Sequence, residues 1–148
     1  MRIVAQRVTR AEVRSGGDTV ARIGRGLLLL IAVEKTDTPA VLDWCADKVL
    51  HMRVFEDSAH KMNVSVLDTG GEMLAVSQFT LAADLSRGRR PGFERAAPPA
   101  EAEPLFEAFV ARLRSGACRV ATGRFRSMME VELVNDGPVT IVIERGGS

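Results

Sequence analysis

The sequence predicts a single domain, residues 1–148, of the α+β class, in which a mostly antiparallel sheet carries two main helices. The chain has 148 residues, of which 46% are hydrophobic, and this suits one folded core with little room for a second. Short β-branched or apolar runs are separated by glycine-rich turn signals, which is typical of strands joined by hairpins. Two longer segments carry apolar residues at helical spacing.

The first strands are expected at the N-terminus. Residues 2–13 are rich in β-branched side chains, and residues 19–23 resume the extended pattern after the turn signal Ser15-Gly16-Gly17-Asp18, so the two runs predict a hairpin. A second turn at Gly24-Arg25-Gly26 leads into residues 27–33, which are apolar at every position. Such a run is typical of a strand that is buried on both faces.

Two helices are expected. The first begins at Thr38, which is a favourable N-cap and is followed by proline at the first helical position. Its apolar stripe consists of Leu42, Cys45, Ala46, Val49 and Leu50. The second helix is expected over residues 99–115, and its buried face consists of Ala102, Leu105, Phe106, Phe109 and Leu113. Each stripe indicates a helix that packs one face on the sheet.

The remaining strands are short. They are expected at residues 53–55, 73–79, 129–134 and 139–143, with the last two joined by a turn at Asn135-Asp136-Gly137-Pro138. Residues 84–98 form a long irregular segment that carries Arg87, Arg89, Arg90 and Arg95. Irregular segments of this length in a compact domain are usually functional or mobile.

Composition excludes several classes of function. The 20 basic and 19 acidic residues argue against a protein held to nucleic acid by bulk charge alone. The longest apolar run has seven residues, too few to cross a bilayer, and the N-terminus lacks a signal peptide, so a cytoplasmic protein without membrane contact is expected. The two cysteines and two histidines lack metal-ligand spacing, so we expect no metal and no cofactor. Cys45 is expected in the core, and His51 at a helix end.

Two local clusters remain as candidates for chemistry. The first cluster lies at the end of a predicted strand and combines two hydroxyls and an amide in Ser77-Gln78-Phe79-Thr80-Leu81. On a strand, Ser77 and Phe79 would face one side of the sheet, and Gln78 and Thr80 would face the other. Such groups, with free backbone N–H groups, can orient a carbonyl or form an oxyanion hole. The simpler interpretation is a strand end whose hydroxyls are satisfied.

The second cluster is Gly137-Pro138 between two predicted strands. Glycine adopts backbone angles closed to other residues and lets another molecule approach the backbone. A bond that precedes proline is the usual place for a cis peptide. The simpler interpretation is a plain hairpin turn.

These two clusters together resemble those of the D-aminoacyl-tRNA deacylases. The matching segments are Ser77-Gln78-Phe79-Thr80-Leu81, Asn135-Asp136-Gly137-Pro138-Val139-Thr140, Gln6-Arg7-Val8-Thr9-Arg10-Ala11, Gly26-Leu27-Leu28, Lys61-Met62-Asn63, Arg90-Pro91-Gly92-Phe93 and Thr122-Gly123-Arg124-Phe125. They cover essentially the whole chain in order. Each motif is short, but both main motifs at this separation are specific.

The resemblance implies a β-barrel-like sheet with flanking helices, and a homodimer with active sites at its interface. It implies hydrolysis of the ester between a D-amino acid and the terminal adenosine of tRNA. The residues that it places in the pocket are Ser77, Gln78, Phe79 and Thr80. Gly137 and Pro138, joined by a cis bond, would enter the partner's pocket and select chirality together with Arg7.

The resemblance also bears on mechanism and on an alternative function. An aminoacyl ester is already activated, so positioning and carbonyl polarisation can suffice for hydrolysis, with the ribose 2′-hydroxyl helping to activate water. Thr80 as a covalent nucleophile is the alternative mechanism, but it lacks a neighbouring base in the sequence. Arg7 and Phe79 resemble the D-specific branch rather than the branch that prefers L-alanyl esters. An animal relative described as a DNA-binding replication factor supplies the alternative function, a nucleic-acid-binding module without turnover.

Overall fold

The structure, a computed structural model, describes residues 1–146. In chain order the elements are β1 (Arg2–Ser15), β2 (Asp18–Ile23), β3 (Gly26–Ala32), α1 (Pro39–His51), β4 (Phe55–Glu56), β5 (Met62–Val64), α2 (Val66–Thr69), β6 (Glu72–Ser77), the 3₁₀ helix η1 (Phe79–Ala82), α3 (Pro99–Arg114), β7 (Val120–Thr122) and β8 (Glu130–Glu144). Within this range no helix is long and apolar enough to span a membrane.

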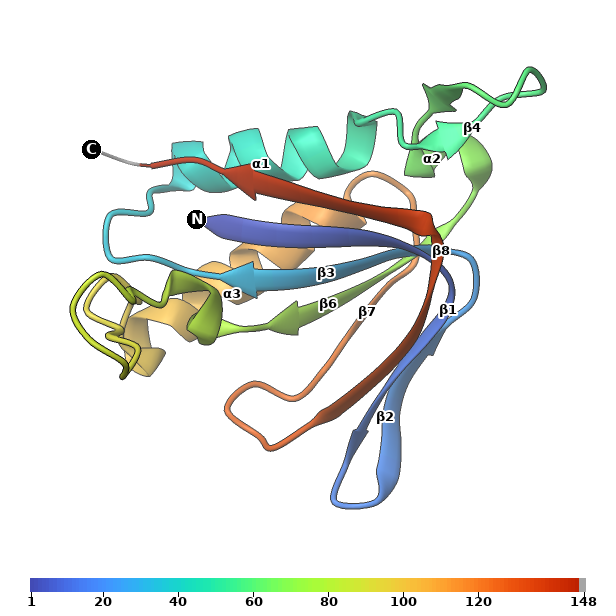
Figure 1. Cartoon of the computed structure of the whole chain (residues 1–148). Coiled ribbons are helices and arrows are strands. Elements are labelled where there is room, and N and C mark those ends of the chain that lie inside the picture. The colour runs from blue at the N-terminus through green and yellow to red at the C-terminus, as the bar shows by residue number, and fades with distance from the viewer. Residues whose placement is uncertain (147–148) are drawn as a thin grey trace.

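One mixed, nearly closed, barrel-like sheet forms the body of the molecule (Figure 1). Its order is β2-β1-β3-β6-β7, and β8 pairs with β1. Strand β1 is antiparallel to β2, β3 and β8, whereas β6 is parallel to both β3 and β7. The expectation of an α+β fold with two main helices is confirmed, but the expectation of a mostly antiparallel sheet is wrong.

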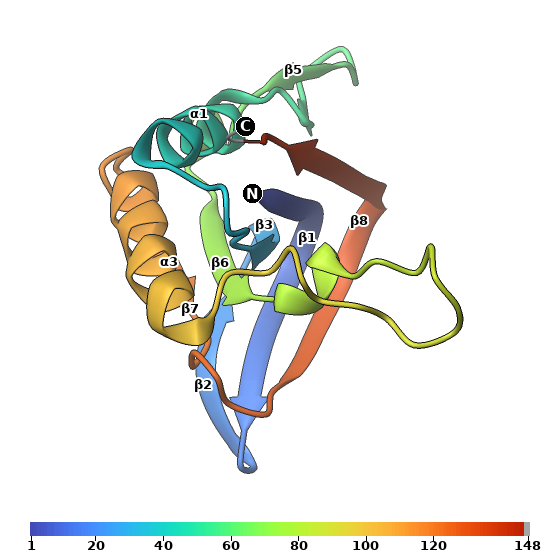
Figure 2. The same cartoon turned by 90° about the vertical axis from the view of Figure 1, so that its left-hand side faces the viewer.

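The two helices explain the parallel pairs. A strand that returns parallel to its predecessor needs a crossover connection, which is usually a helix. Helix α1 lies between β3 and β6 along the chain, and α3 lies between β6 and β7. Both helices cover the same face of the sheet (Figure 2) and pack on the main core, in which Phe55 and Phe109 are fully buried.

Helix α1 begins where the sequence predicts. The Thr38 hydroxyl oxygen accepts a hydrogen bond from the Val41 backbone N–H at 3.3 Å, and Pro39 is the first helical residue. The expected stripe of α1 is buried, and so is nearly all of β3, which confirms both predictions. Cys45 is fully buried, and burial raises its pKa to about 11, so it is an uncharged thiol of the core at neutral pH.

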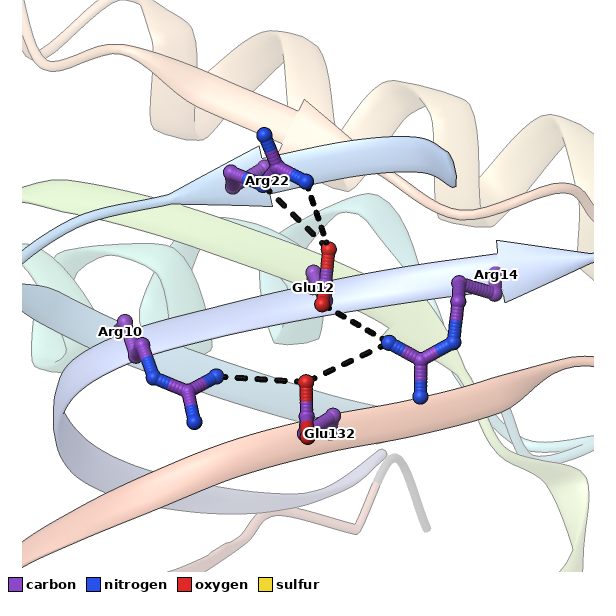
Figure 3. A network of polar contacts seen from close by, with 5 residues as sticks. All are labelled: Arg10, Glu12, Arg14, Arg22 and Glu132. Atoms are coloured by element: carbon purple, nitrogen blue, oxygen red, sulfur yellow. Dashed lines mark hydrogen bonds and ion pairs between the residues drawn. The ribbon is translucent and has the colours of Figure 1, made fainter. Parts of the chain in front are cut away.

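A network of charged side chains ties β2, β1 and β8 together (Figure 3). Glu12 of β1 lies opposite both Arg22 of β2 and Glu132 of β8. Arg14 Nη1 donates to Glu12 at 2.8 Å and to Glu132 at 3.3 Å, while Arg22 and Arg10 each bind one of these carboxylates. The guanidinium of Arg14 therefore bridges two carboxylates that would otherwise repel each other across the strands.

Candidate active site

The Ser77–Thr80 segment turns out of the sheet. Strand β6 ends at Ser77, whose partner in β3 is Ile31. The Gln78 N–H still donates to the Ile31 carbonyl at 2.7 Å, but β3 ends one residue later, and the chain bends into η1. The expectation that residues 73–79 form one strand with alternating faces is therefore wrong beyond Ser77, because no neighbouring strand continues to pair with it.

The turn brings Gln78 and Thr80 together. The Gln78 side-chain amide donates to the Thr80 hydroxyl oxygen. Within residues 1–146 this amide is the only hydrogen-bonding group on the Thr80 hydroxyl, and neither an imidazole nor a carboxylate contacts it. A threonine hydroxyl needs an adjacent base to become an effective nucleophile. The arrangement therefore suits orientation of a polar ligand better than covalent attack by Thr80.

Phe79 gives this turn an exposed apolar surface. Its side chain is 55% exposed and packs edge-to-face on Phe93, with 5.1 Å between ring centroids. Arg2 supports the same turn, because its Nη1 donates to the Leu81 carbonyl at 2.9 Å. The turn is thus fixed from two sides, while Phe79 and Thr80 stay open to solvent.

Gly137 and Pro138 lie within β8 rather than between two strands. Val8 of β1 pairs with Asn135 and Gln6 pairs with Thr140, so residues 136–139 form a bulge opposite Arg7. The expectation of two strands joined by a hairpin turn is therefore wrong: both flanks pair with the same strand, and the chain keeps its direction. Gly137 and Pro138 are exposed, and their peptide bond is cis.

Two side chains hold this bulge. Arg7 is only 5% exposed; it donates through Nε to the Asp136 carbonyl at 3.0 Å and through Nη1 to the Val54 carbonyl at 2.8 Å. The Asn135 side chain closes the bulge, with its Oδ1 accepting from the Val139 N–H at 2.7 Å. Arg7 was expected at this site. Asn135 was expected only as part of a turn, for which it is a typical residue, and its part in closing the bulge was not predicted.

The structure brings Arg7 to Gly137, and Gln78 to Thr80, but it keeps the two groups apart within one chain. Helix η1 is held by Arg2, whereas the bulge lies opposite Arg7, five residues further along β1. At about 3.4 Å per residue, the backbones of these two arginines lie roughly 17 Å apart along the strand. In Figure 1, η1 and the bend of β8 lie toward opposite ends of the sheet. One chain therefore presents two separate candidate half-sites: the η1 half-site, which is Ser77 to Thr80, and the bulge half-site, which is Gly137 and Pro138 with Arg7.

No other constellation competes with these half-sites in the part of the chain that the structure describes. No group of three His, Cys, Asp or Glu side chains there is placed to hold a metal ion. His51 lies at the C-terminal end of α1 and contacts the Asp47 carbonyl through Nδ1 at 3.0 Å, which agrees with the helix-end role expected for it. His60 is in an exposed turn beside Glu56.

The fold and the two groups define a small α+β protein with exposed hydroxyl, amide and backbone groups, in which no base contacts the Thr80 hydroxyl within residues 1–146. The family model described as D-Tyr-tRNA(Tyr) deacylase matches residues 4–144. The chain belongs to this family, and membership makes it a hydrolase of the deacylase kind, as the sequence resemblance implied.

Individual relatives agree with this assignment. The chain is 56% identical over 144 residues to a D-aminoacyl-tRNA deacylase of Symbiobacterium thermophilum, covering 97% of this chain and 95% of the relative. It is 54% identical to that of Shouchella clausii, covering 97% and 99%. A solved structure named c-Myc DNA Unwinding Element Binding Protein superposes with a TM-score of 0.93 and 41% identity, covering 98% of this chain and 99% of that one.

Proposed function

We propose that the protein hydrolyses the ester of D-aminoacyl-tRNA, and of glycyl-tRNA, to release free amino acid and tRNA as chiral proofreading in the cytoplasm. The observation that carries this proposal is the Thr80 hydroxyl, which within residues 1–146 is bonded to the Gln78 amide and to no base. Such a site suits a substrate that is already activated. An aminoacyl ester is such a substrate, and its hydrolysis depends mainly on positioning and on polarisation of the carbonyl.

Each residue of the η1 half-site has a proposed part. Ser77, Gln78 and Thr80 with their backbone N–H groups orient the ester carbonyl and stabilise the oxyanion that forms on it. The exposed ring of Phe79 offers an apolar surface to the aminoacylated end of the substrate. Water attacks with help from the ribose 2′-hydroxyl, so no covalent Thr80 intermediate forms.

The second half-site selects chirality. Gly137 and Pro138 are exposed on a bulge that Arg7 fixes through a buried guanidinium. A rigid backbone wall can exclude an L side chain by contact at the substrate Cα without touching a D side chain. Many D residues then fit, and so does glycine, which has no side chain to exclude.

The separation of the half-sites supports a site that is completed by a second copy of the chain. We propose a homodimer in which Gly137 and Pro138 of one copy complete the Ser77–Thr80 pocket of the other. The edge strand β8 carries three exposed apolar side chains that a partner would cover: Val134, Ile141 and Val142. A twofold axis repeats the contact, so two composite sites arise together.

Purified protein with matched D- and L-tyrosyl-tRNA tests the function. We expect rapid release of D-tyrosine and of glycine from glycyl-tRNA, with L-tyrosyl-tRNA largely spared. Equal rates on the two tyrosyl esters would contradict the chiral selection. Light scattering at micromolar concentration tests the assembly, and a fully active monomer would contradict the composite site.

The alternative is a nucleic-acid-binding module without turnover. It is favoured by the structural relative whose name describes DNA binding, at 41% identity. Against it stand the formal net charge of only +1 and the presence of both half-sites. Filter binding to nucleic acid beside the ester assay separates the two, because the module would retain nucleic acid and release no amino acid.

A further inference from the structure

The loop between η1 and α3 carries three arginines that the protein itself leaves unused. Arg87, Arg89 and Arg90 are exposed, and within residues 1–146 their guanidinium groups make no hydrogen bond, ion pair or aromatic contact. Most of the other arginines are engaged. Those that form ion pairs with carboxylates are Arg2, Arg7, Arg10, Arg14, Arg22, Arg95, Arg112 and Arg119.

This loop is built onto the η1 half-site. Asp84 and Gly92 exchange two backbone hydrogen bonds of 2.8 Å, which close residues 85–91 into a loop directly after η1. The next residue, Phe93, is the one that packs on Phe79. The Asp84 carboxylate accepts from the Ser86 N–H at 2.9 Å, and hydrogen bonds from Ser86 lower its pKa, so the base of the loop carries a fixed negative charge.

The free positive charge lies at the outer part of the loop. In Figure 2 the loop projects away from the sheet and from α3. Each of the three arginines is at most three residues from Asp84 or Gly92. Three residues of backbone span at most about 11 Å, so their backbones stay within that distance of the bridge beside the half-site. The cleft at the base of the loop, about 440 Å³, holds four cations. Arg2 and Arg95 are paired with Glu144 and Glu34, and Arg145 lies over Trp44, which leaves Lys35 without an ion pair within residues 1–146.

We propose that Arg87, Arg89 and Arg90 bind backbone phosphates of the single-stranded 3′ end of an aminoacylated RNA while its ester occupies the η1 half-site. The proposal rests on the proposed function, which places that ester there. Guanidinium groups bind phosphates through paired N–H donors, and arginine suits this task better than lysine. Phosphates lead away from a terminal adenosine, so a projecting cationic loop beside the pocket meets them without entering the reaction.

The triple variant R87Q/R89Q/R90Q tests this directly. Its matched control is R53Q/R124Q/R126Q, which removes the same charge from arginines that also lack an ion pair within residues 1–146 but lie on other segments. Binding of uncharged tRNA is measured by fluorescence anisotropy at salt concentrations from about 0.05 to about 0.2 M, a range in which phosphate contacts are strongly screened. Hydrolysis is measured on D-tyrosyl-tRNA and on D-tyrosyl-adenosine, which has no phosphate.

We expect the loop variant to lose up to three phosphate contacts. At about 0.7 per contact for a single strand, the slope of log affinity against log salt then flattens by about 2, and affinity near 0.1 M salt falls by up to about 100-fold. Its kcat/KM on D-tyrosyl-tRNA falls with the affinity, whereas hydrolysis of D-tyrosyl-adenosine is unchanged. The control variant keeps the wild-type slope.

Three results would overturn the proposal. An unchanged slope in the loop variant shows that these arginines bind no phosphate, and an equal change in the control shows only an effect of net charge. A loop variant that becomes monomeric by light scattering assigns the arginines to the contact between copies. The anisotropy arm requires no turnover, so wild-type protein that binds tRNA through this loop but spares D-tyrosyl-tRNA would refute the proposed function and leave the loop assignment standing.

Discussion

Replacing Gly137 with alanine tests whether backbone geometry selects the substrate. Gly137 has φ +135°, a conformation that L side chains rarely adopt. A Cβ there would lie 2.8 Å from Val139 Cγ2 and 3.2 Å from Arg7 Nη2. Neither neighbour yields freely, because Val139 and Arg7 are both buried, so the bulge itself must shift.

The expected effect follows from this crowding. Overpacking costs about 1–3 kcal/mol. At about 1.4 kcal/mol per tenfold, this corresponds to roughly a 5- to 150-fold loss of rate if all of it falls on the transition state. Thr80→Ala should cost less under the proposed mechanism, in which the Thr80 hydroxyl, an acceptor from Gln78, helps to orient the substrate and forms no covalent bond with it.

Single-turnover hydrolysis of D- and L-tyrosyl-tRNA measures both variants, with circular dichroism as the check on folding. Gly16→Ala is the matched control: Gly16 also has positive φ, +60°, but lies in the β1–β2 turn, where an added Cβ meets nothing within 4 Å. We expect Gly137→Ala to be slow and less selective, and Gly16→Ala to behave as wild type.

The opposite order of effects would refute this reasoning. If Thr80→Ala reduces turnover to background while Gly137→Ala keeps nearly full rate and chirality, the hydroxyl of Thr80 is the nucleophile and the positioning mechanism is wrong. If Gly16→Ala loses as much activity as Gly137→Ala, positive φ at a distant turn suffices to explain the loss, and the bulge has no special part in it.

Four further outcomes are expected. Arg7→Lys leaves a buried carbonyl without its donor, which costs about 1–3 kcal/mol in urea unfolding and loosens chiral selection. Arg14→Gln leaves Glu12 and Glu132 facing each other and destabilises the fold at pH 7, and the deficit shrinks on acidification as a carboxyl protonates. Hydrogen bonds from the Gly24 N–H and from Arg119 lower the pKa of the Glu72 carboxyl below its ordinary value of 4.5. The stability that the ionised carboxylate contributes is therefore present above pH 4.5 and is lost as the pH falls through the lowered pKa. Glu72→Gln should cost on the order of 1 kcal/mol of unfolding free energy at pH 7 and progressively less in acid. Extended chelation should leave the deacylation rate unchanged, and loss with recovery by one specific ion would contradict this.

Local patterns predicted the elements whose causes are local. The start of α1 depends on Thr38 and Pro39, which are adjacent in sequence, and its buried stripe depends on spacing within one helix. The apolar run of β3 correctly predicted a strand buried on both faces, because the hydrophobicity of each residue in the run indicates its burial. The direction of β6 relative to β3 follows from the crossover through α1. The predicted order of strand, helix and strand already carried this signal, but the expectation of a mostly antiparallel sheet did not use it.

The same limit applies to the half-sites: sequence patterns predicted their residue types but not the strand pairing around them. Asn135 to Pro138 has the composition of a hairpin turn, yet both flanks pair with β1, and Arg7 fills the gap opposite the bulge. Likewise, the polarity of Ser77 to Thr80 is evident in sequence, but the chain leaves the sheet after Ser77, where the paired part of β3 is one residue from its end. The residue types indicated a candidate chemistry, and strand pairing decided where each group lies.

The support that β1 gives to both half-sites predicts which substitutions should change the reaction rate and chiral selection together. Because Arg7 fixes the bulge and Arg2 fixes η1, a single strand, β1, supports both half-sites at positions roughly 17 Å apart. In a twofold dimer, one altered β1 would then displace the pocket of its own copy and the selecting bulge that reaches the partner's pocket. Substitutions in β1 should therefore affect rate and chirality together, whereas changes confined to the arginine-bearing loop should affect affinity for RNA alone.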